Sequence, residues 1–155
     1  MAAWSEVEHG FGAILGLILG SDRRGAMTLY LALTGSASKT AALRAIARDR
    51  MSEGRWAELE ELLKAAKGSA GERNDLAHGI WGYDTGYPDH LVLMPPNEMT
   101  RWTGGLLKPL KPGDPSPGPE LLLYSEKDFL DTGERIAAVK NRQILLAANI
   151  LSDRT

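Results

Sequence analysis

Apolar residues recur at intervals of three and four along much of the chain, which is the spacing that places them on one face of an α-helix. The first segment with this pattern predicts a helix whose apolar face is formed by Trp4, Val7, Phe11, Ile14, Leu15 and Ile18. Glycine also repeats every fourth residue there, at Gly12, Gly16 and Gly20. Small residues at this spacing let another backbone approach closely. We interpret them as packing inside one molecule, with a dimer interface as the alternative.

Three further helices are predicted before residue 70, and the short turns between them indicate a helical bundle. The second is predicted to be capped by Ser21-Asp22, to run through Met27, Tyr30, Leu31 and Leu33, and to end at Gly35. The third is capped by Ser36 or Ser38 and turns inward Leu43, Ile46 and Ala47. The fourth turns inward Trp56, Leu59, Leu62, Leu63 and Ala66.

Residues 67–71 interrupt the helical pattern with two glycines. Ser69 followed by Glu72 has the spacing of a capping box, in which each side chain satisfies a free backbone amide at the start of a helix. A new helix is therefore predicted from about residue 70. It places Arg73 in or just beyond its first turn and His78 about one turn later.

The helical periodicity is lost between residues 84 and 124, where most of the prolines lie. Short β-prone runs at 90–94, 99–103 and 121–124 predict a small antiparallel β insert. Residues 109–119, with five prolines and two glycines, predict an exposed loop. Ser125 then caps a last helix whose inward face is formed by Ile136, Val139, Gln143, Leu146 and Ile150. We therefore expect a mainly α fold: a single domain over residues 1–155, with a bundle of five to six helices and the β insert before the C-terminal helix.

Composition narrows the possible functions only slightly. The chain has 18 Lys and Arg against 20 Asp and Glu, a net charge of -2, so contact with nucleic acid requires a local basic patch. Cysteine is absent, which excludes disulfides and thiolate chemistry. The apolar run 11–19 is too short to span a bilayer, and the residues before it lack the positive charge of a secretory signal. We expect a cytoplasmic protein with no metal, cofactor or membrane contact.

The segment from Glu72 to Gly79 holds the most promising chemistry. Asn74 and His78 are four residues apart and share a helix face, while the long side chain of Arg73 can reach toward them. At a helix start, free amides would also favour an anion. A neutral imidazole can move the proton of a ribose 2′-hydroxyl, and a guanidinium can hold phosphate oxygens. This set of groups suits phosphate chemistry on RNA without a metal.

The run Arg73-Asn-Asp-Leu-Ala-His-Gly79, within a helical chain, resembles the HEPN superfamily (higher eukaryote and prokaryote nucleotide-binding). The resemblance implies a helical bundle that commonly dimerises. In active members it implies a metal-independent endoribonuclease of toxin or defence type, in which Arg and His of two protomers meet and cleavage leaves a cyclic phosphate. Arg73, Asn74 and His78 are the residues that match.

Two features depart from the family's pattern. The proline-rich β insert is not part of the minimal bundle, and it could cover the cleft or hold a partner. Antitoxin-paired members that are silenced by nucleotidylation often carry a Tyr two positions after the His, whereas this chain has Ile80 there and Tyr83 nearby. The resemblance implies an inhibitor or antitoxin protein as a candidate partner, whereas Ile80 argues against silencing by nucleotidylation at that position.

Other residues could support RNA binding or serve structure alone. Arg48 and Arg55, with Arg44 and Arg50, form a local basic cluster that could steer RNA, although a solvated helix face is the ordinary interpretation. Trp81 and Tyr83 could stack on bases or pack in the interior.

A purely structural role is also open for the motif itself. In that interpretation His78 packs beside Trp81 and caps a carbonyl, while Arg73 pairs with Glu72 or Asp75. A non-catalytic module that binds RNA, a nucleotide or a protein is then the alternative function.

Overall fold

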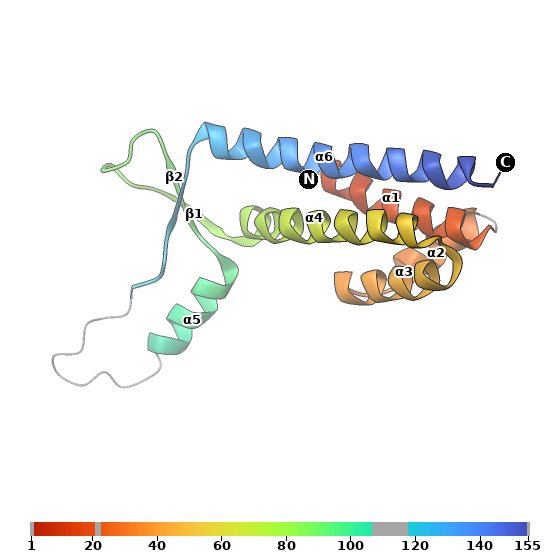
Figure 1. The fold of residues 1–155 in the computed structure, drawn as a ribbon. Helices are drawn as coiled ribbons and strands as arrows, with labels where there is room; N and C mark the ends of the chain where they lie inside the picture. Colours follow the sequence, from red (N-terminus) through yellow and green to blue (C-terminus); the bar gives the residue numbers. More distant parts are fainter. Residues whose placement is uncertain (1, 21–22, 107–117, 155) are drawn as a thin grey trace. The chain divides into compact units, whose positions relative to one another are not determined.

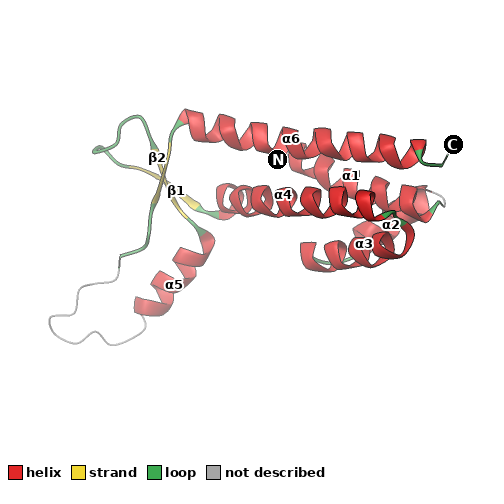
Figure 2. Ribbon diagram, in the orientation of Figure 1, coloured by secondary structure: helices red, strands yellow, loops and turns green. Residues whose placement is uncertain are grey.

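The computed structural model describes residues 2–20, 23–106 and 118–154. In this part of the chain there are six helices and one three-stranded sheet, which confirms the predicted mainly α fold with a small antiparallel sheet before the C-terminal helix (Figure 2). The helices are α1 (Ala2–Leu19), α2 (Arg23–Ala32), α3 (Ser36–Arg50), α4 (Glu53–His78), α5 (Pro96–Leu106) and α6 (Glu126–Ser152). The strands are β1 (Ile80–Tyr83), β2 (Leu91–Met94) and β3 (Leu122–Tyr124).

Two compact units make up the chain. The larger unit comprises Met1–Ser69 with Glu134–Thr155, and the smaller unit comprises Ala70–Gly133. The boundary falls within α4 and within α6, so each of these helices contributes to both units. A single-domain organisation stays a prediction. None of the helices described here has both the length and the apolar composition needed to cross a lipid bilayer.

The core of the larger unit is built from the apolar faces that the periodicity predicts. Figure 1 shows α1 alongside the portions of α4 and α6 that belong to this unit. The predicted inward residues of α1 from Val7 to Ile18 are buried, and so are Leu43, Leu59 and Leu62. At Gly12 a side chain would meet Met27 and Tyr30 of α2. The glycine at this position therefore serves packing inside the molecule.

The start of α3 differs from the prediction. Gly35 is its N-cap residue, with φ of 79°, and Ser36 is already the first helical residue. Neither Ser36 nor Ser38 caps the helix, because no side chain makes a capping hydrogen bond there. Gly35 can adopt the left-handed conformation that this tight connection requires. The predicted cap at Ser21-Asp22 lies outside the described residues.

The predicted helix start near residue 70 is wrong. α4 continues without a break from Glu53 to His78, and Ser69 is a buried residue in its interior. Two glycines in a helix cost about 1 kcal/mol each relative to alanine. The buried leucines and Ala66 one to three turns earlier outweigh this cost, since most helix stability in proteins comes from packing of an apolar face.

The smaller unit contains the antiparallel sheet, in the order β1-β2-β3. Trp81 pairs with Leu93, and Leu93 pairs with Leu122 on the third strand. The runs 90–94 and 121–124 do form strands, but the run 99–103 lies in α5, and β1 was not predicted. Pro96 begins α5, where its fixed φ suits a helix, and Thr100 donates its hydroxyl to the carbonyl oxygen of Pro96. Most of the predicted loop 109–119 lies outside the described residues.

The start of α6 confirms the predicted cap. The Ser125 hydroxyl and amide both donate to Oδ2 of Asp128, at 2.7 and 2.8 Å, and the Asp128 amide donates to Ser125 Oγ at 3.4 Å. This reciprocal pattern is a capping box. The predicted inward residues Val139, Gln143, Leu146 and Ile150 are buried, and Ile136 packs against the core.

Candidate functional site

Arg73, Asn74 and His78 lie in the last two turns of α4, and His78 is the final helical residue. The expectation that they stand at a helix start is therefore wrong. The C-terminal end of a helix presents carbonyl oxygens and a partial negative charge, which favours cations over anions. The backbone at this site does not attract a phosphate, so any phosphate contact must come from side chains.

The three side chains differ in their exposure. Asn74 and His78 are exposed, and their spacing of four places them on one face of the helix. Within the described residues, neither side chain makes a hydrogen bond, an ion pair or a ring contact. Arg73 is half-buried and engages in an interaction inside the protein, as does Glu72. The site therefore presents an amide and an imidazole to solvent, and the half-buried Arg73 precedes Asn74 on the same helix.

The chain leaves α4 through a crowded position. The Gly79 amide donates to the carbonyl oxygen of Asp75 at 2.8 Å. A side chain at Gly79 would overlap Leu93 and the carbonyl oxygens of Asp75 and Met94. Only glycine fits here, and this packing fixes the direction in which β1 follows His78.

Trp81 has a structural role in the smaller unit. Its indole Nε1 donates to the carbonyl oxygen of Leu76 at 3.1 Å, and its ring packs against Tyr124 and Phe129 with centroid distances of 5.6 and 5.5 Å. The indole therefore does not pack as a partner for His78. This arrangement follows the structural interpretation of Trp81 and not the base-stacking one.

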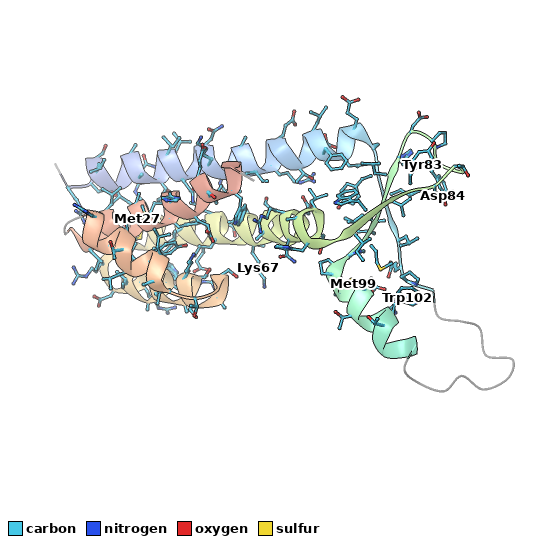
Figure 3. The ribbon with its side chains drawn as sticks, turned by 180° about the vertical axis from the view of Figure 1, so that it is seen from behind. Met27, Lys67, Tyr83, Asp84, Met99 and Trp102 are labelled. Carbon is cyan, nitrogen blue, oxygen red and sulfur yellow. The ribbon has the colours of Figure 1, made fainter. Side chains whose placement is uncertain are left out.

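Tyr83 is the exposed aromatic residue next to the motif. It is 64% exposed at the end of β1, beside Asp84 at the hairpin that leads to β2 (Figure 3). The Asp84 carboxylate accepts a hydrogen bond of 2.8 Å from the Gly86 amide and so supports the turn. Tyr83 has the exposure that stacking on a base requires.

The basic cluster of the larger unit is largely neutralised. Arg44 makes two hydrogen bonds of 2.7 and 2.9 Å to Glu60. Arg55 bonds both Glu58 and Asp153, and this pairing lowers the pKa of the Asp153 carboxyl. Arg48 lies over the Trp56 ring, 5.9 Å from its centroid. Arg48 is therefore the more available cation, while Arg55 serves structure.

The structure contains a pocket that the sequence did not indicate. It has a volume of about 580 Å³ and lies in the larger unit, where Arg50, Arg55 and Arg154 contribute to its wall. Arg154 donates to the carbonyl oxygen of Ile18 at 3.1 Å. None of the three motif residues lines this pocket. No group of three or more potential metal ligands occurs in the part of the chain that the structure describes.

Comparison with protein-family models, with curated proteins and with solved structures found no match for this chain. The similarity to the HEPN superfamily therefore stands on the seven residues Arg73–Gly79 and on the helical organisation, and family membership stays a prediction.

Proposed function

We propose that this protein is a HEPN-like domain that acts on RNA as a metal-independent endoribonuclease, with Arg73, Asn74 and His78 as its site. The observation that carries the proposal is the state of His78. It is exposed at the end of α4 and makes no hydrogen bond, ion pair or ring contact with another described residue, and the Trp81 indole donates to Leu76, so no carbonyl cap or ring contact with Trp81 engages it. A histidine whose imidazole is not engaged in a hydrogen bond or ion pair is suited to proton transfer near neutral pH.

Each residue has a distinct role in the proposed reaction. His78 takes the proton from a ribose 2′-hydroxyl, whose oxygen attacks the adjacent phosphorus, or it donates a proton to the departing 5′-oxygen. Arg73 stabilises the negative charge that builds on the phosphate oxygens. Asn74 orients the imidazole or binds the phosphate. The products are a 2′,3′-cyclic phosphate and a free 5′-hydroxyl, and two protomers together supply the acid and the base.

The test is cleavage of structured and unstructured RNAs by the purified protein in EDTA. Wild-type protein is compared with Arg73→Ala and His78→Ala, whose folding is verified by circular dichroism. Loss of general acid-base catalysis is expected to slow cleavage by about 10²–10⁴-fold. His9→Ala and Arg44→Ala are the matched controls, since His9 is also an exposed helical histidine and Arg44 also an arginine, and both lie in the larger unit.

The end groups of the RNA products show which cleavage reaction took place. A cyclic phosphate on the upstream product supports the proposal, whereas cleavage that is unaffected by both motif substitutions points to another site or a contaminant. Absence of cleavage by wild-type protein on every RNA would reject the ribonuclease.

A second candidate is a non-catalytic module that binds RNA, a nucleotide or a protein. It is favoured by the position of the 580 Å³ pocket, which none of the motif residues lines, and by large apolar side chains exposed on α6. Under this function the protein does not cleave RNA, and the His78→Ala variant still binds the partner.

A further inference from the structure

Strand β1 forms an edge of the sheet, because β2 pairs with it on one side only. Among the described residues, none forms a hydrogen bond with the outward-facing backbone groups of β1. Ile80 and Tyr83 are 51% and 64% exposed, so this edge is open. Proteins usually protect an open edge with a charged residue, a proline or a bulge. The β1 sequence, Ile-Trp-Gly-Tyr, pairs with β2 without a bulge and contains neither a charge nor a proline, so a further strand can pair with it.

The other edge of the sheet is less accessible than β1. β3 has only three residues, of which Leu122 and Tyr124 are half-buried. The Glu120 amide, just before β3, donates to the Glu98 carboxylate of α5 at 3.2 Å. β1 is therefore the edge at which another strand is expected to pair.

The side chains of β1 indicate what such a strand must carry. Trp81 and Tyr83 lie on one face of the sheet, where Tyr83 is directly opposite Leu91 of β2. Leu91 is itself 44% exposed. A strand added to the outer edge of β1 would place its own side chains beside Trp81 and Tyr83, on the side away from β2. Apolar residues at every second position of the added strand would bury these aromatic rings further.

The surroundings of β1 are acidic. From Asn74 to Thr100 the chain has four carboxylates and no Lys or Arg. The smaller unit has ten Asp and Glu against five Lys and Arg, a net charge of -5, although the whole chain carries only -2. Asp84 and Asp89 lie in the hairpin between β1 and β2, are exposed and form no ion pair with another described residue. Figure 3 shows Asp84 next to Tyr83 at this end of the strand. Positive charge on a partner would be complementary.

We propose that β1 binds an extended, positively charged segment of a partner protein, which adds a fourth strand to the sheet. Backbone hydrogen bonds to the outer edge of β1 supply affinity, as in other complexes formed by strand addition. Apolar residues at every second position of the segment lie beside Trp81 and Tyr83. Lys or Arg residues alternate with them, and the end of the segment near the hairpin meets Asp84 and Asp89.

This inference concerns the β insert and does not rest on the proposed ribonuclease. Binding of the segment is measured without RNA, and cleavage of RNA is measured without the segment. Each proposal can therefore fail while the other holds.

The test uses the full chain, isotope-labelled for NMR, and a synthetic octapeptide in which Lys and Val alternate and both ends are blocked. The peptide is expected to shift the amide signals of residues 80–83. Successive amides of a strand point to opposite edges, so hydrogen exchange is expected to slow only at alternate residues of β1. The slowing should be about tenfold when nine-tenths of the protein is bound, since exchange then proceeds from the free tenth. Binding should weaken as the salt concentration rises from about 0.05 to about 0.5 M.

Two control peptides separate backbone pairing from charge. One has the same sequence but is N-methylated at its four central residues, so it keeps its charge and loses the donors that would pair with β1. The other has Glu in place of Lys. Each control is expected to bind at least about tenfold more weakly than the Lys-Val peptide.

Variants of the protein test the same two contributions. The double substitution Asp84→Asn and Asp89→Asn is expected to weaken binding by about 2–10-fold, the range for two exposed ion pairs. Its matched control is Glu53→Gln with Glu61→Gln, two exposed carboxylates of α4 in the larger unit. Tyr83→Lys places a positive charge on the edge and is expected to abolish detectable binding. The NMR spectrum of each variant shows whether it is folded.

Four outcomes would overturn the proposal. The Lys-Val peptide leaves the β1 amides unchanged, the N-methylated peptide binds as tightly, the Glu-Val peptide binds as tightly, or the shifted amides all lie outside residues 80–83. A single-stranded oligouridylate is titrated in the same way. If this RNA shifts the β1 amides and the Lys-Val peptide does not, the edge binds RNA and not a protein segment.

Discussion

Gln143 on α6 lies against Gly10 on α1, and its Nε2 atom donates a hydrogen bond of 2.8 Å to the carbonyl oxygen of Val7. A Cβ atom at position 10 would overlap the amide group of this side chain. Gln143 is only 3% exposed, so it has little room to move away. The contact fixes the spacing of α1 and α6 in the core of the larger unit.

Substitution of Gly10 by Ala is therefore expected to destabilise the protein by about 1–3 kcal/mol, the usual cost of overpacking a well-packed core. The measurement is the free energy of unfolding in urea. Gly68→Ala is the matched control, because the space around Gly68 in α4 is open and alanine should stabilise the helix by about 1 kcal/mol. Equal effects of the two substitutions would contradict the role of the Gln143 contact.

The capping box of α6 predicts a dependence of stability on pH. The hydroxyl and amide of Ser125, and then the charges of Lys127 and His90, lower the pKa of Asp128 below its ordinary value of 3.8. A carboxyl with a lowered pKa in the folded state stabilises the protein above 3.8, and this stability is lost as the pH falls through the folded-state pKa.

The test compares wild-type protein with Asp128→Asn and Ser125→Ala. The difference in unfolding free energy between wild type and Asp128→Asn is expected to be largest at neutral pH and to shrink below about pH 4. Ser125→Ala should cost about 1 kcal/mol, as for other helix caps. A difference that grows on acidification would have the wrong sign for this mechanism.

Helices α1, α3 and α6 could be predicted because each buries an apolar face that is visible as spacing in the sequence, whereas α5 buries no such face and part of it was expected to be a strand. The residues of α6 from Val139 to Ile150 illustrate this, since their periodicity identifies the buried side without knowledge of what packs on it. The interior of α4 could not be predicted in the same way. Gly68 and Gly71 give a strong local signal for a break, and the burial of the apolar face before them, together with Ser69, outweighs it.

The candidate site was only partly predictable for a similar reason. The spacing of Asn74 and His78 correctly places both on one exposed face, because that depends on helical geometry alone. The neutralisation of Arg55 by Asp153 joins residues that are 98 positions apart, so no local pattern reveals it. The same holds for the groove of about 220 Å³ between α4 and α6, which is lined by Leu62 and Leu146, residues far apart in the sequence.

Trp81 and Tyr83 should respond differently to truncation. Trp81→Ala removes a hydrogen bond and two ring contacts, and it is expected to destabilise the protein by about 3 kcal/mol. Tyr83→Ala should change stability by less than about 0.5 kcal/mol, because Tyr83 is exposed.

Under the proposed function, Tyr83→Ala weakens binding of single-stranded RNA by about 1–3 kcal/mol, the contribution of one stacked base. Fluorescence anisotropy measures this loss. Both proteins in the comparison carry His78→Ala, so that the RNA is not cleaved during the measurement. Unchanged RNA affinity would remove Tyr83 from the proposed site while leaving the catalytic roles untouched.

Gly79→Ala tests the crowded exit from α4. The new methyl group would meet the carbonyl oxygens of Asp75 and Met94, and backbone cannot yield as a flexible side chain does. We expect a loss of about 2–3 kcal/mol in the free energy of unfolding. Gly82→Ala has open space around it and should be tolerated. If Gly79→Ala is as stable as wild type, the path of the chain after His78 differs from the one described, and the presentation of His78 must be reconsidered with it.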